Sequence, residues 1–237
     1  MSTTPRGRGR LTGVGVGPGD PGLLTRRAVE VLESADRVVA PVTAGQEPGR
    51  AESVVRAVLG DLDITRLPFE MTRDASHAAA GRALLPWLGA GEHVAFVTLG
   101  DPAVYSTFPS VVAALRALGC TAAVDTVPGI TAFQDLAARS GTVLLDGTES
   151  LSLVTALDGP AHLDAALDDP TRTVVVYKGG AYLPQVAALL AARGRLSGAV
   201  FGERLGLDGE RVCPLADAAG APASYLATVI VPPAVTR

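Results

Sequence analysis

The chain has few residues of the kinds that build metal centres or disulfide frameworks. It contains two cysteines, Cys120 and Cys213, which stand far apart and form no CxxC pair. The three histidines, His77, His93 and His162, are equally scattered. We therefore expect no metal site and two reduced thiols, with the cytoplasm as the location.

Long apolar runs are missing as well. No stretch reaches the roughly 18 consecutive apolar residues of a membrane-spanning helix. The basic start, residues 1–10, lacks the apolar core of a signal peptide, and we expect it to be a disordered tail. The sequence therefore predicts no membrane partner.

Positive charge is sparse too, since the 237 residues carry a net charge of −4. This balance argues against a nucleic-acid partner, which would require a basic footprint. An acidic ligand would need positive charge concentrated locally by arginines. With 48% hydrophobic and 19% charged residues, the chain is globular rather than disordered.

What the chain does have is a series of short apolar strands that end in Gly, Pro and polar residues. The most informative stretch is Val94–Phe108. Its apolar start breaks at Gly100-Asp101-Pro102, and three hydroxyls follow at Tyr105, Ser106 and Thr107. Because open α/β sheets bind small molecules at the carboxyl ends of strands, we interpret this loop as the floor of a cofactor site. An ordinary strand-to-helix turn is the alternative interpretation.

The order of predicted elements indicates two α/β lobes. Residues 11–121 alternate between strands and helices, which predicts a mostly parallel, doubly wound sheet with right-handed crossovers. Residues 122–237 carry several strands close together, which predicts a mixed sheet. Two lobes of this kind imply a ligand cleft between them. The strands we predict are 11–16, 36–40, 64–67, 94–97 and 120–124 in the first lobe, and 151–154, 173–177, 199–203, 211–214 and 225–231 in the second.

A glycine-rich loop after the first predicted strand fits a dinucleotide-binding fingerprint at Gly17, Gly19 and Gly22. Pro21 has no N–H to offer a phosphate, and Asp20 would repel a pyrophosphate. We therefore favour a tight turn, or a pocket-facing Asp20 that serves another ligand.

Three motifs in order resemble the signatures of the tetrapyrrole methylases, a family of S-adenosylmethionine-dependent enzymes of corrin and sirohaem synthesis. The motifs are Gly15–Thr25, Gly100-Asp101-Pro102 and Pro128-Gly129-Ile130-Thr131. Further details resemble the subgroup that methylates carbon 20 of precorrin-2, notably residues 105–107, 146–151, 177–178 and 224–228. The resemblance spans about residues 11–231. Ala227 and Phe108 are mild departures from the subgroup's pattern.

The resemblance implies a two-lobe fold, S-adenosylmethionine as cofactor, a tetrapyrrole substrate and a homodimer. It places one set of residues at the cofactor: Leu99, Gly100, Asp101, Val104, Thr131, Ala132, Lys178 and Thr228. The Asp101 carboxylate would hold the amino-acid end, and Lys178 and Thr228 would lie near the adenine and ribose. Asp20 would face the tetrapyrrole.

Methyl transfer to a ring carbon releases a proton, so a general base is expected. Asp20, Tyr105 and Glu149 are the candidates, each with a plain structural alternative. The substrate is a polycarboxylate, and charge-assisted pairing with arginine should dominate its affinity. Candidate partners are Arg50, Arg73, Arg139 and Arg204.

Three alternatives remain open at this stage. The chain could be another methylase of the same fold, acting on uroporphyrinogen III, on cobalt-factor II or on a protein side chain. It could be a nucleotide-dependent oxidoreductase that uses the loop at 17–22. It could also be a tetrapyrrole carrier without catalytic activity.

Overall fold

The computed structural model describes residues 8–43, 48–69 and 73–234, with only the backbone for 73–75. The chain divides into two compact units, Met1–Thr131 and Ala132–Arg237. The predicted tail lies mostly outside the described residues, and Arg10 is already part of the first strand.

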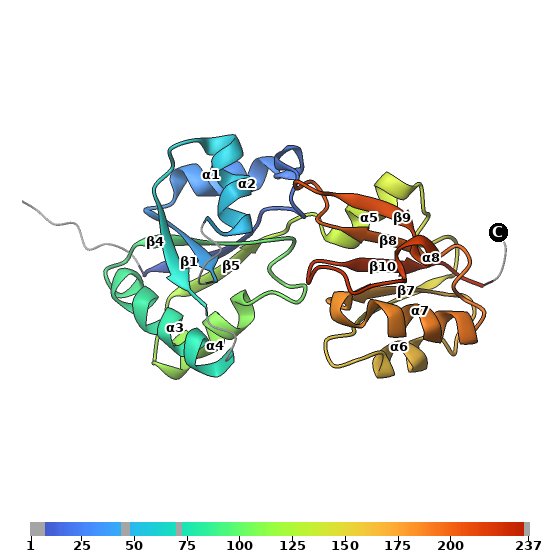
Figure 1. Ribbon diagram of the computed structural model, residues 1–237. Coiled ribbons are helices and arrows are strands. Elements are labelled where there is room, and N and C mark those ends of the chain that lie inside the picture. Colours follow the sequence, from blue (N-terminus) through green and yellow to red (C-terminus); the bar gives the residue numbers. More distant parts are fainter. Residues whose placement is uncertain (1–7, 44–47, 70–72, 235–237) are drawn as a thin grey trace, which may run out of the picture. The chain divides into compact units, whose positions relative to one another are not determined.

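The first unit contains a parallel five-stranded sheet in the order β3-β2-β4-β1-β5 (Figure 1). Its strands are β1 (Arg10–Gly15), β2 (Arg37–Val42), β3 (Ile64–Pro68), β4 (His93–Thr98) and β5 (Ala123–Val127). All four neighbouring pairs are parallel. The doubly wound parallel sheet expected from the sequence is confirmed.

Helices cover both faces of this sheet, and each face has its own core. The helices are α1 (Arg26–Ser34), α2 (Arg50–Leu59), α3 (Arg73–Gly89) and α4 (Phe108–Ala117). Buried side chains of α1 and α2 pack on one face of the sheet, and those of α3 and α4 pack on the other (Figure 1). Near-continuous apolar strands such as β4 suit a sheet that is buried on both sides.

Strand β2 continues through Pro41, where we expected it to end. Pro41 pairs with Leu67 of β3, but the pairing of β2 with β4 stops at Val39. On the side facing β4, no strand pairs with Pro41, so the missing N–H costs no hydrogen bond between strands. A sheet tolerates proline at such a position.

The division between the units falls after Thr131, ten residues beyond the expected boundary at 121/122. The difference comes from the fifth strand. We predicted it at 120–124, whereas β5 spans Ala123–Val127 and pairs with β1 from Arg10 to Val14. The strand therefore belongs entirely to the first sheet, and the loop that follows it, up to Thr131, is part of the first unit.

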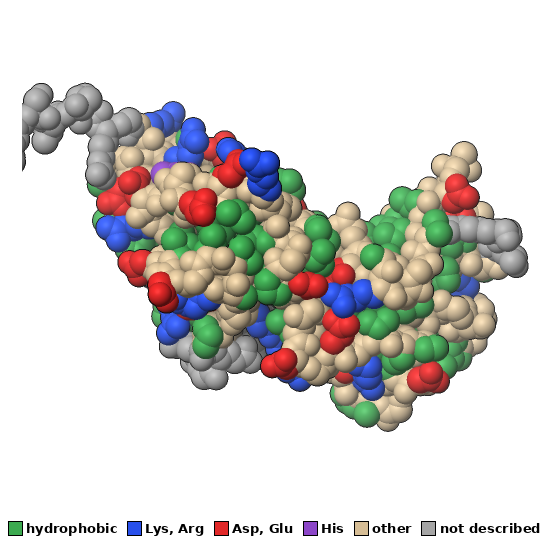
Figure 2. Space-filling view, turned by 90° about the horizontal axis from the view of Figure 1, so that it is seen from above, with side chains coloured by type: hydrophobic (Ala, Val, Ile, Leu, Met, Phe, Trp, Pro, Cys, Tyr) green, Lys and Arg blue, Asp and Glu red, His purple; other side chains and the backbone are tan. Residues whose placement is uncertain are grey.

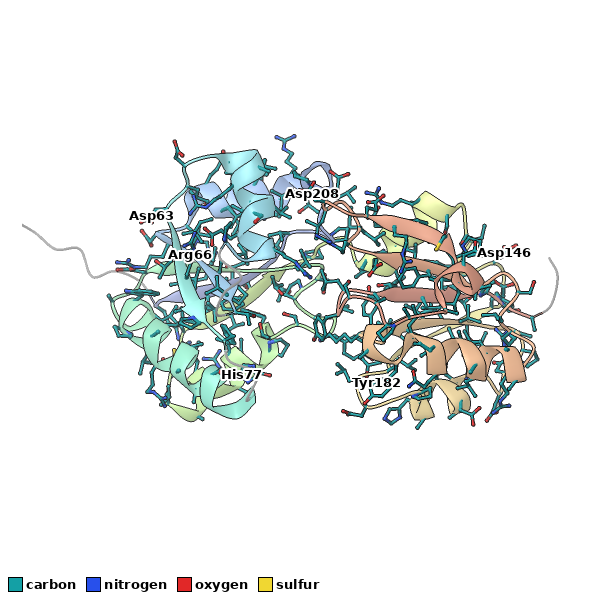
Figure 3. The ribbon with its side chains drawn as sticks, in the orientation of Figure 1. Asp63, Arg66, His77, Asp146, Tyr182 and Asp208 are labelled. Carbon is teal, nitrogen blue, oxygen red and sulfur yellow. The ribbon has the colours of Figure 1, made fainter. Side chains whose placement is uncertain are left out.

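A buried carboxylate joins α2 to β3 in the first unit. Glu52 has 0% of its surface exposed, and its carboxylate accepts hydrogen bonds from Arg56 Nε at 2.7 Å and Arg66 Nε at 2.8 Å. Figure 3 labels Arg66. The hydrogen bonds from Arg66 lower the pKa of Glu52, against the opposing effect of burial. The Glu52 carboxylate therefore connects α2 to β3 through Arg66.

The second unit contains a mixed five-stranded sheet in the order β6-β7-β10-β8-β9 (Figure 1). Its strands are β6 (Ser150–Thr155), β7 (Arg172–Tyr177), β8 (Val200–Glu203), β9 (Arg211–Pro214) and β10 (Thr228–Val231). Strands β6 and β7 are parallel, and the other neighbouring pairs are antiparallel. The mixed sheet is confirmed.

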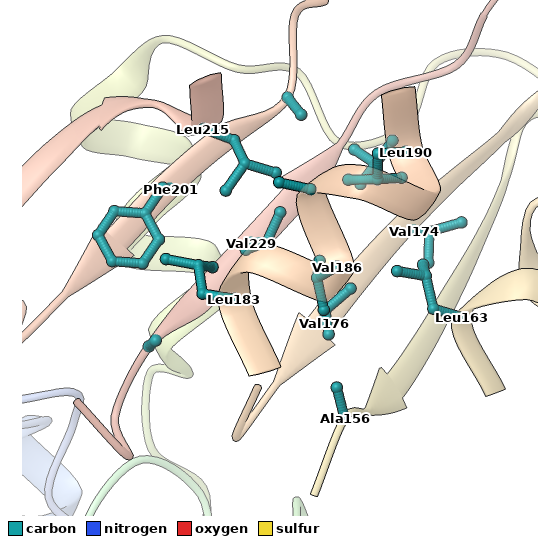
Figure 4. Close-up of a cluster of buried hydrophobic side chains, with 14 of the residues drawn as sticks. Ala156, Leu163, Val174, Val176, Leu183, Val186, Leu190, Phe201, Leu215 and Val229 are labelled. Carbon is teal, nitrogen blue, oxygen red and sulfur yellow. The ribbon is translucent and has the colours of Figure 1, made fainter. Parts of the chain in front are cut away.

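One apolar cluster fills one face of this sheet. Val174, Val176 and Val229 from the strands pack against helices α6 (Ala161–Ala166), α7 (Leu183–Ala192) and α8 (Leu215–Ala218) (Figure 4). A short 3-10 helix, η2 (Gly180–Tyr182), leads into α7. Helix α5 (Ala132–Ser140) packs across β8, β9 and β10.

The last strand is shorter than predicted, because residues 225–227 form a turn instead of extending it. The Ala227 N–H donates to the Ser224 carbonyl at 3.0 Å, and the Ser224 N–H donates to Glu203 Oε2 at 2.9 Å. The apolar sequence from Tyr225 to Val231 therefore does not lie in the sheet as a whole.

Charged side chains of both signs are interspersed on the face drawn in Figure 2, without a large field of one sign. None of the described helices has the length and apolar character needed to cross a bilayer.

Candidate functional site

The first unit has a topological switch point between its neighbouring strands β1 and β4. The chain leaves β1 for α1 on one face of the sheet, whereas it leaves β4 for α4 on the other. Ligands of open α/β sheets bind where neighbouring loops diverge in this way. The two loops are residues 16–25 and 99–107, which carry the glycine-rich and Gly-Asp-Pro motifs.

Backbone contacts hold the strand-end loops of this unit together. The Gly100 N–H donates to the Gly17 carbonyl at 2.7 Å, and the Gly17 N–H donates back to Gly100 at 3.4 Å. A Cβ at Gly129 would lie 2.1 Å from the Gly100 oxygen, and one at Gly15 would lie 2.6 Å from the same atom. Side chains are therefore excluded at Gly15 and Gly129, and backbone lines this part of the strand ends.

Asp101 fastens two of these loops to each other. Its Oδ1 accepts from the Ala103 N–H at 2.7 Å, and its Oδ2 accepts from the Gly129 N–H at 3.0 Å. The carboxylate therefore shapes its own turn and clamps it to the loop after β5. Each carboxylate oxygen can accept more than one hydrogen bond, so the clamped group is still able to receive a ligand ammonium.

The first unit brings together five of the predicted cofactor residues. Leu99, Gly100, Asp101 and Val104 lie on the loop after β4 and are each partly buried. Thr131, with 7% of its surface exposed, lies on the loop that Asp101 clamps. A backbone-lined loop pair with one carboxylate fits the polar, amino-acid end of S-adenosylmethionine.

The glycine-rich loop lacks the form of a dinucleotide turn. Residues Pro21–Leu23 form a 3-10 helix, η1, and Asp20 caps it by accepting from the Gly22 N–H at 2.8 Å. Helix α1 begins only at Arg26, with Thr25 as its N-cap. Because no long helix starts directly after the glycines, the arrangement that binds pyrophosphate is not formed there.

Three residues other than glycine adopt a positive φ within the described chain, and each follows the end of a strand. They are Tyr105 (φ 47°) after β4, Lys178 (φ 57°) after β7 and Arg204 (φ 55°) after β8. A left-handed backbone costs such residues about 1–2 kcal/mol, and strain of this kind concentrates at functional sites. Lys178 and Arg204 come directly after β7 and β8, whereas Tyr105 lies within the loop between β4 and α4.

The neighbours of Tyr105 hold its loop in shape. Ser106 Oγ accepts from the Phe108 N–H at 3.0 Å at the start of α4, and it lies 3.1 Å from Thr98 Oγ1 at the end of β4. Tyr105 itself keeps 45% of its surface exposed. The loop therefore leaves the Tyr105 side chain partly accessible to solvent.

In the second unit, Lys178 and Thr228 lie at the same end of the strands, where β7 and β8 finish and β10 begins; we call this the β10-start edge of the sheet. Strands β7 and β8 both run antiparallel to β10, so their carboxyl ends share an edge with its first residue. Thr228 pairs with Tyr177 on one side and with Gly202 on the other. The Lys178 ammonium lies 5.5 Å from the centroid of the Tyr225 ring.

Tyr177 connects this edge to α5, which begins at Ala132. Its hydroxyl accepts from the Phe133 N–H at 3.0 Å and so satisfies one of the unpaired donors at the helix start. We did not predict this contact from the sequence. The feature that could have indicated it is the hydroxyl of Tyr177 at the end of the apolar strand Thr173–Tyr177.

Glu149 takes part in a local turn. Its Oε2 accepts from the Asp146 N–H at 2.8 Å, and its own N–H donates to the Asp146 carbonyl at 3.0 Å. This geometry favours the structural interpretation of Glu149 over a catalytic one.

The candidate arginines differ in how far their charge is already balanced. Arg139 pairs with Asp135 and Glu210, both at 2.9 Å. The Arg73 side chain lies outside the described residues, and Arg50 begins α2. Arg204 is exposed and has no ion pair within the described chain. Of the four, Arg204 best fits an external carboxylate.

The two cysteines are both free. Burial raises the pKa of the Cys213 thiol, which disfavours the reactive thiolate. Within the described ranges, no three Cys, His, Asp or Glu side chains gather as metal ligands would.

Comparison with known proteins places the chain. The sequence model for Tetrapyrrole (Corrin/Porphyrin) Methylases matches residues 10–219. A precorrin-2 C(20)-methyltransferase of Sinorhizobium sp is 34% identical over 241 residues, which cover 95% of this chain and 96% of that protein. A cobalt-precorrin-2 C(20)-methyltransferase of Salmonella typhimurium is 33% identical over 211 residues, 86% of each chain.

A solved structure agrees with this placement. The uroporphyrin-III C-methyl transferase of Thermus thermophilus, in complex with S-adenosyl homocysteine, has a TM-score of 0.67 and 25% identity, and the match covers 94% of this chain and 97% of that one. The family expected from the three motifs is thereby confirmed. The chain belongs to the tetrapyrrole (corrin/porphyrin) methylase family.

Proposed function

We propose that this protein transfers the methyl group of S-adenosylmethionine to carbon 20 of precorrin-2, giving precorrin-3A in cobalamin biosynthesis. The relative of that name matches almost the whole chain at 34% identity. The structural observation that carries the proposal is the Gly-Asp-Pro loop at the switch point of the first sheet, clamped by Asp101 to the loop that ends at Thr131.

The first unit supplies one set of cofactor contacts in this proposal. Leu99, Gly100 and Val104 offer backbone and apolar surface, Asp101 receives the ammonium group, and Thr131 adds a hydroxyl. S-adenosylmethionine supplies an electrophilic methyl group on its sulfonium. The protein's task is then to hold the donor in one orientation, and the interlocked loops provide a rigid base for this.

We assign a second set of contacts to Ala132, Lys178 and Thr228 of the second unit. Thr228 lies between Tyr177 and Gly202 with 2% of its surface exposed, so its backbone position is well defined. We assign Ala132 and the Lys178 backbone to the adenosine part of the cofactor.

A proton leaves carbon 20 after methyl transfer. The Asp20 carboxylate can accept it directly or through water, whereas the neutral Tyr105 hydroxyl can take it up only while passing its own proton on to water. Tyr105 is exposed on a strained backbone, as a group held for a ligand would be. Asp20 is a carboxylate at the start of the glycine-rich loop's 3-10 helix, where its Oδ1 accepts from the Gly22 N–H. We rank Glu149 below both, because its carboxylate closes a turn.

A direct comparison of substrates tests the proposal. The purified protein is supplied with labelled S-adenosylmethionine and, separately, metal-free precorrin-2, cobalt-precorrin-2 or uroporphyrinogen III. We expect methyl transfer to precorrin-2. A preference for the cobalt form would point to the second candidate, which the Salmonella relative supports. Transfer to uroporphyrinogen III alone would overturn both.

We further propose that the enzyme is a homodimer, as its resemblance to the family implies, and that it is located in the cytoplasm. Light scattering coupled to size-exclusion chromatography would test the oligomeric state. A single species at twice the 24.1 kDa chain mass supports the dimer, and a monomer across the accessible concentrations contradicts it.

A further inference from the structure

We propose that Lys178 and Arg204 together bind carboxylate groups of the tetrapyrrole substrate. This inference rests on the proposed function and adds to it a substrate-binding role for the two side chains. It starts from their position at one edge of the second sheet, directly after two strands that flank β10.

The sheet register places the two residues on either side of the start of β10. Lys178 follows Tyr177, and Arg204 lies two residues after Gly202, and both Tyr177 and Gly202 pair with Thr228. Two strand spacings separate their backbones by about 10 Å. Two long cationic side chains at that separation can reach neighbouring carboxylates on one polyacid ring.

Both residues hold a left-handed backbone, with φ of 57° at Lys178 and 55° at Arg204. Glycine would adopt this conformation without strain, yet both positions carry a long cation. Lys178 is also the single lysine in a chain whose other cationic side chains are arginines and histidines. Backbone strain at two positions that both carry a charged side chain favours a ligand-binding role for those side chains.

No carboxylate of the described residues forms an ion pair with Arg204. Glu203, next to it in sequence, pairs with Arg211 at 2.9 Å and accepts from the Ser224 N–H at 2.9 Å. The Arg204 guanidinium instead lies along Gly209, in the loop between β8 and β9 that Asp208 marks in Figure 3. Among the described residues it makes no hydrogen bond or ion pair, so its donors are open to an anion.

The charge of the two possible ligands decides between them. S-adenosylmethionine carries a sulfonium, an ammonium and one carboxylate, so it is a net cation. Two further cations beside its neutral adenosine part would weaken its binding. The tetrapyrrole is a polycarboxylate, for which charge-assisted hydrogen bonds from Lys and Arg are favourable. The two side chains therefore match the substrate better than the cofactor.

The test uses Lys178→Asn, Arg204→Asn and the double variant, because asparagine tolerates a left-handed backbone and keeps the fold. The probe is uroporphyrin, a stable porphyrin octacarboxylate, with its methyl ester as the neutral counterpart. Fluorescence titration measures porphyrin binding, and calorimetry measures S-adenosylhomocysteine binding. Arg26→Gln is the control, because that side chain is 94% exposed on α1.

We expect each single variant to weaken uroporphyrin binding about tenfold and the double variant further. The effect on S-adenosylhomocysteine affinity should be much smaller, because we assign only the Lys178 backbone to the cofactor and asparagine can keep that backbone conformation. The difference in uroporphyrin affinity between wild type and variants should become smaller at high salt. The charge-preserving variants Lys178→Arg and Arg204→Lys should keep most of the wild-type affinity. The control should bind as the wild type does.

Two results would overturn the inference. One is uroporphyrin affinity that is unchanged in the double variant, or equal for the acid and the ester in the wild type. The other is a selective loss of S-adenosylhomocysteine binding. Failure of the proposed function is distinguishable, because it appears as absent methyl transfer to precorrin-2 in the wild type.

Discussion

Asp101 is a single side chain that holds the backbone of two loops together. Its two oxygens engage the N–H groups of Ala103 and Gly129 on separate loops. From the sequence we predicted a carboxylate at the cofactor, and the residue does lie at the switch point. The clamp was not predictable, because it depends on β5 lying beside β1, a contact between distant segments.

Replacing Asp101 tests this double role. Asp101→Ala releases both loops, so we expect the affinity for S-adenosylmethionine to fall at least tenfold, with a loss of only about 1–2 kcal/mol in unfolding free energy. Calorimetry and chemical denaturation measure the two effects. Asp63→Ala, at an exposed position before β3, is the control. A folded Asp101→Ala protein with wild-type affinity would remove Asp101 from the site.

Tyr105 gives a second prediction for a single residue. If its hydroxyl relays the proton from carbon 20 to water, giving up its own proton as it takes up the new one, Tyr105→Phe should lower kcat about a hundredfold while the affinity for S-adenosylhomocysteine stays unchanged. The substitution keeps the ring and the backbone, so folding should be unaffected. An unchanged kcat would exclude the hydroxyl from proton transfer and leave Asp20 as the candidate.

Contacts between elements explain where prediction from the sequence succeeded and where it failed. Strand β9 has the predicted bounds, because local sequence and flanking turns define it. Strand β2 runs past Pro41 because β4 does not pair with it there. The start of β10 is delayed because Glu203 holds Ser224 in a turn. These exceptions depend on partners distant in sequence.

The contact between α2 and β3 makes a prediction about pH. Hydrogen bonds from Arg66 lower the pKa of Glu52 in the folded protein, so the unfolded chain takes up the proton first. The resulting stability is present above the ordinary pKa of 4.5 and is lost as the pH falls below it. We expect Glu52→Gln to be less stable than wild type at neutral pH.

Denaturation curves across the acid range check this contribution. The difference in unfolding free energy between wild type and Glu52→Gln should narrow steadily as the pH falls below about 4.5. Glu33→Gln, on α1, serves as the control and should leave the pH profile unchanged. A gap that stays constant with pH would show that the Glu52 charge contributes nothing to stability.

For the whole molecule, the sequence predicted the two α/β units and the family. Three motifs marked loops after β1, β4 and β5, and these are the loops that interlock through Gly17, Gly100 and Gly129. The sequence could not predict the strained backbone at Tyr105, Lys178 and Arg204, because most residues with those side chains have ordinary φ values. That strain points to the strand ends as the place of function.

The measurement that tests the central claim most directly is the position of a transferred methyl group. The protein is incubated with precorrin-2 and S-adenosylmethionine that carries carbon-13 in its methyl group, and the product is examined by NMR and mass spectrometry. We predict a product one methyl group heavier than precorrin-2, with the label on carbon 20. Label on another carbon, or no transfer by the folded protein, would contradict the account.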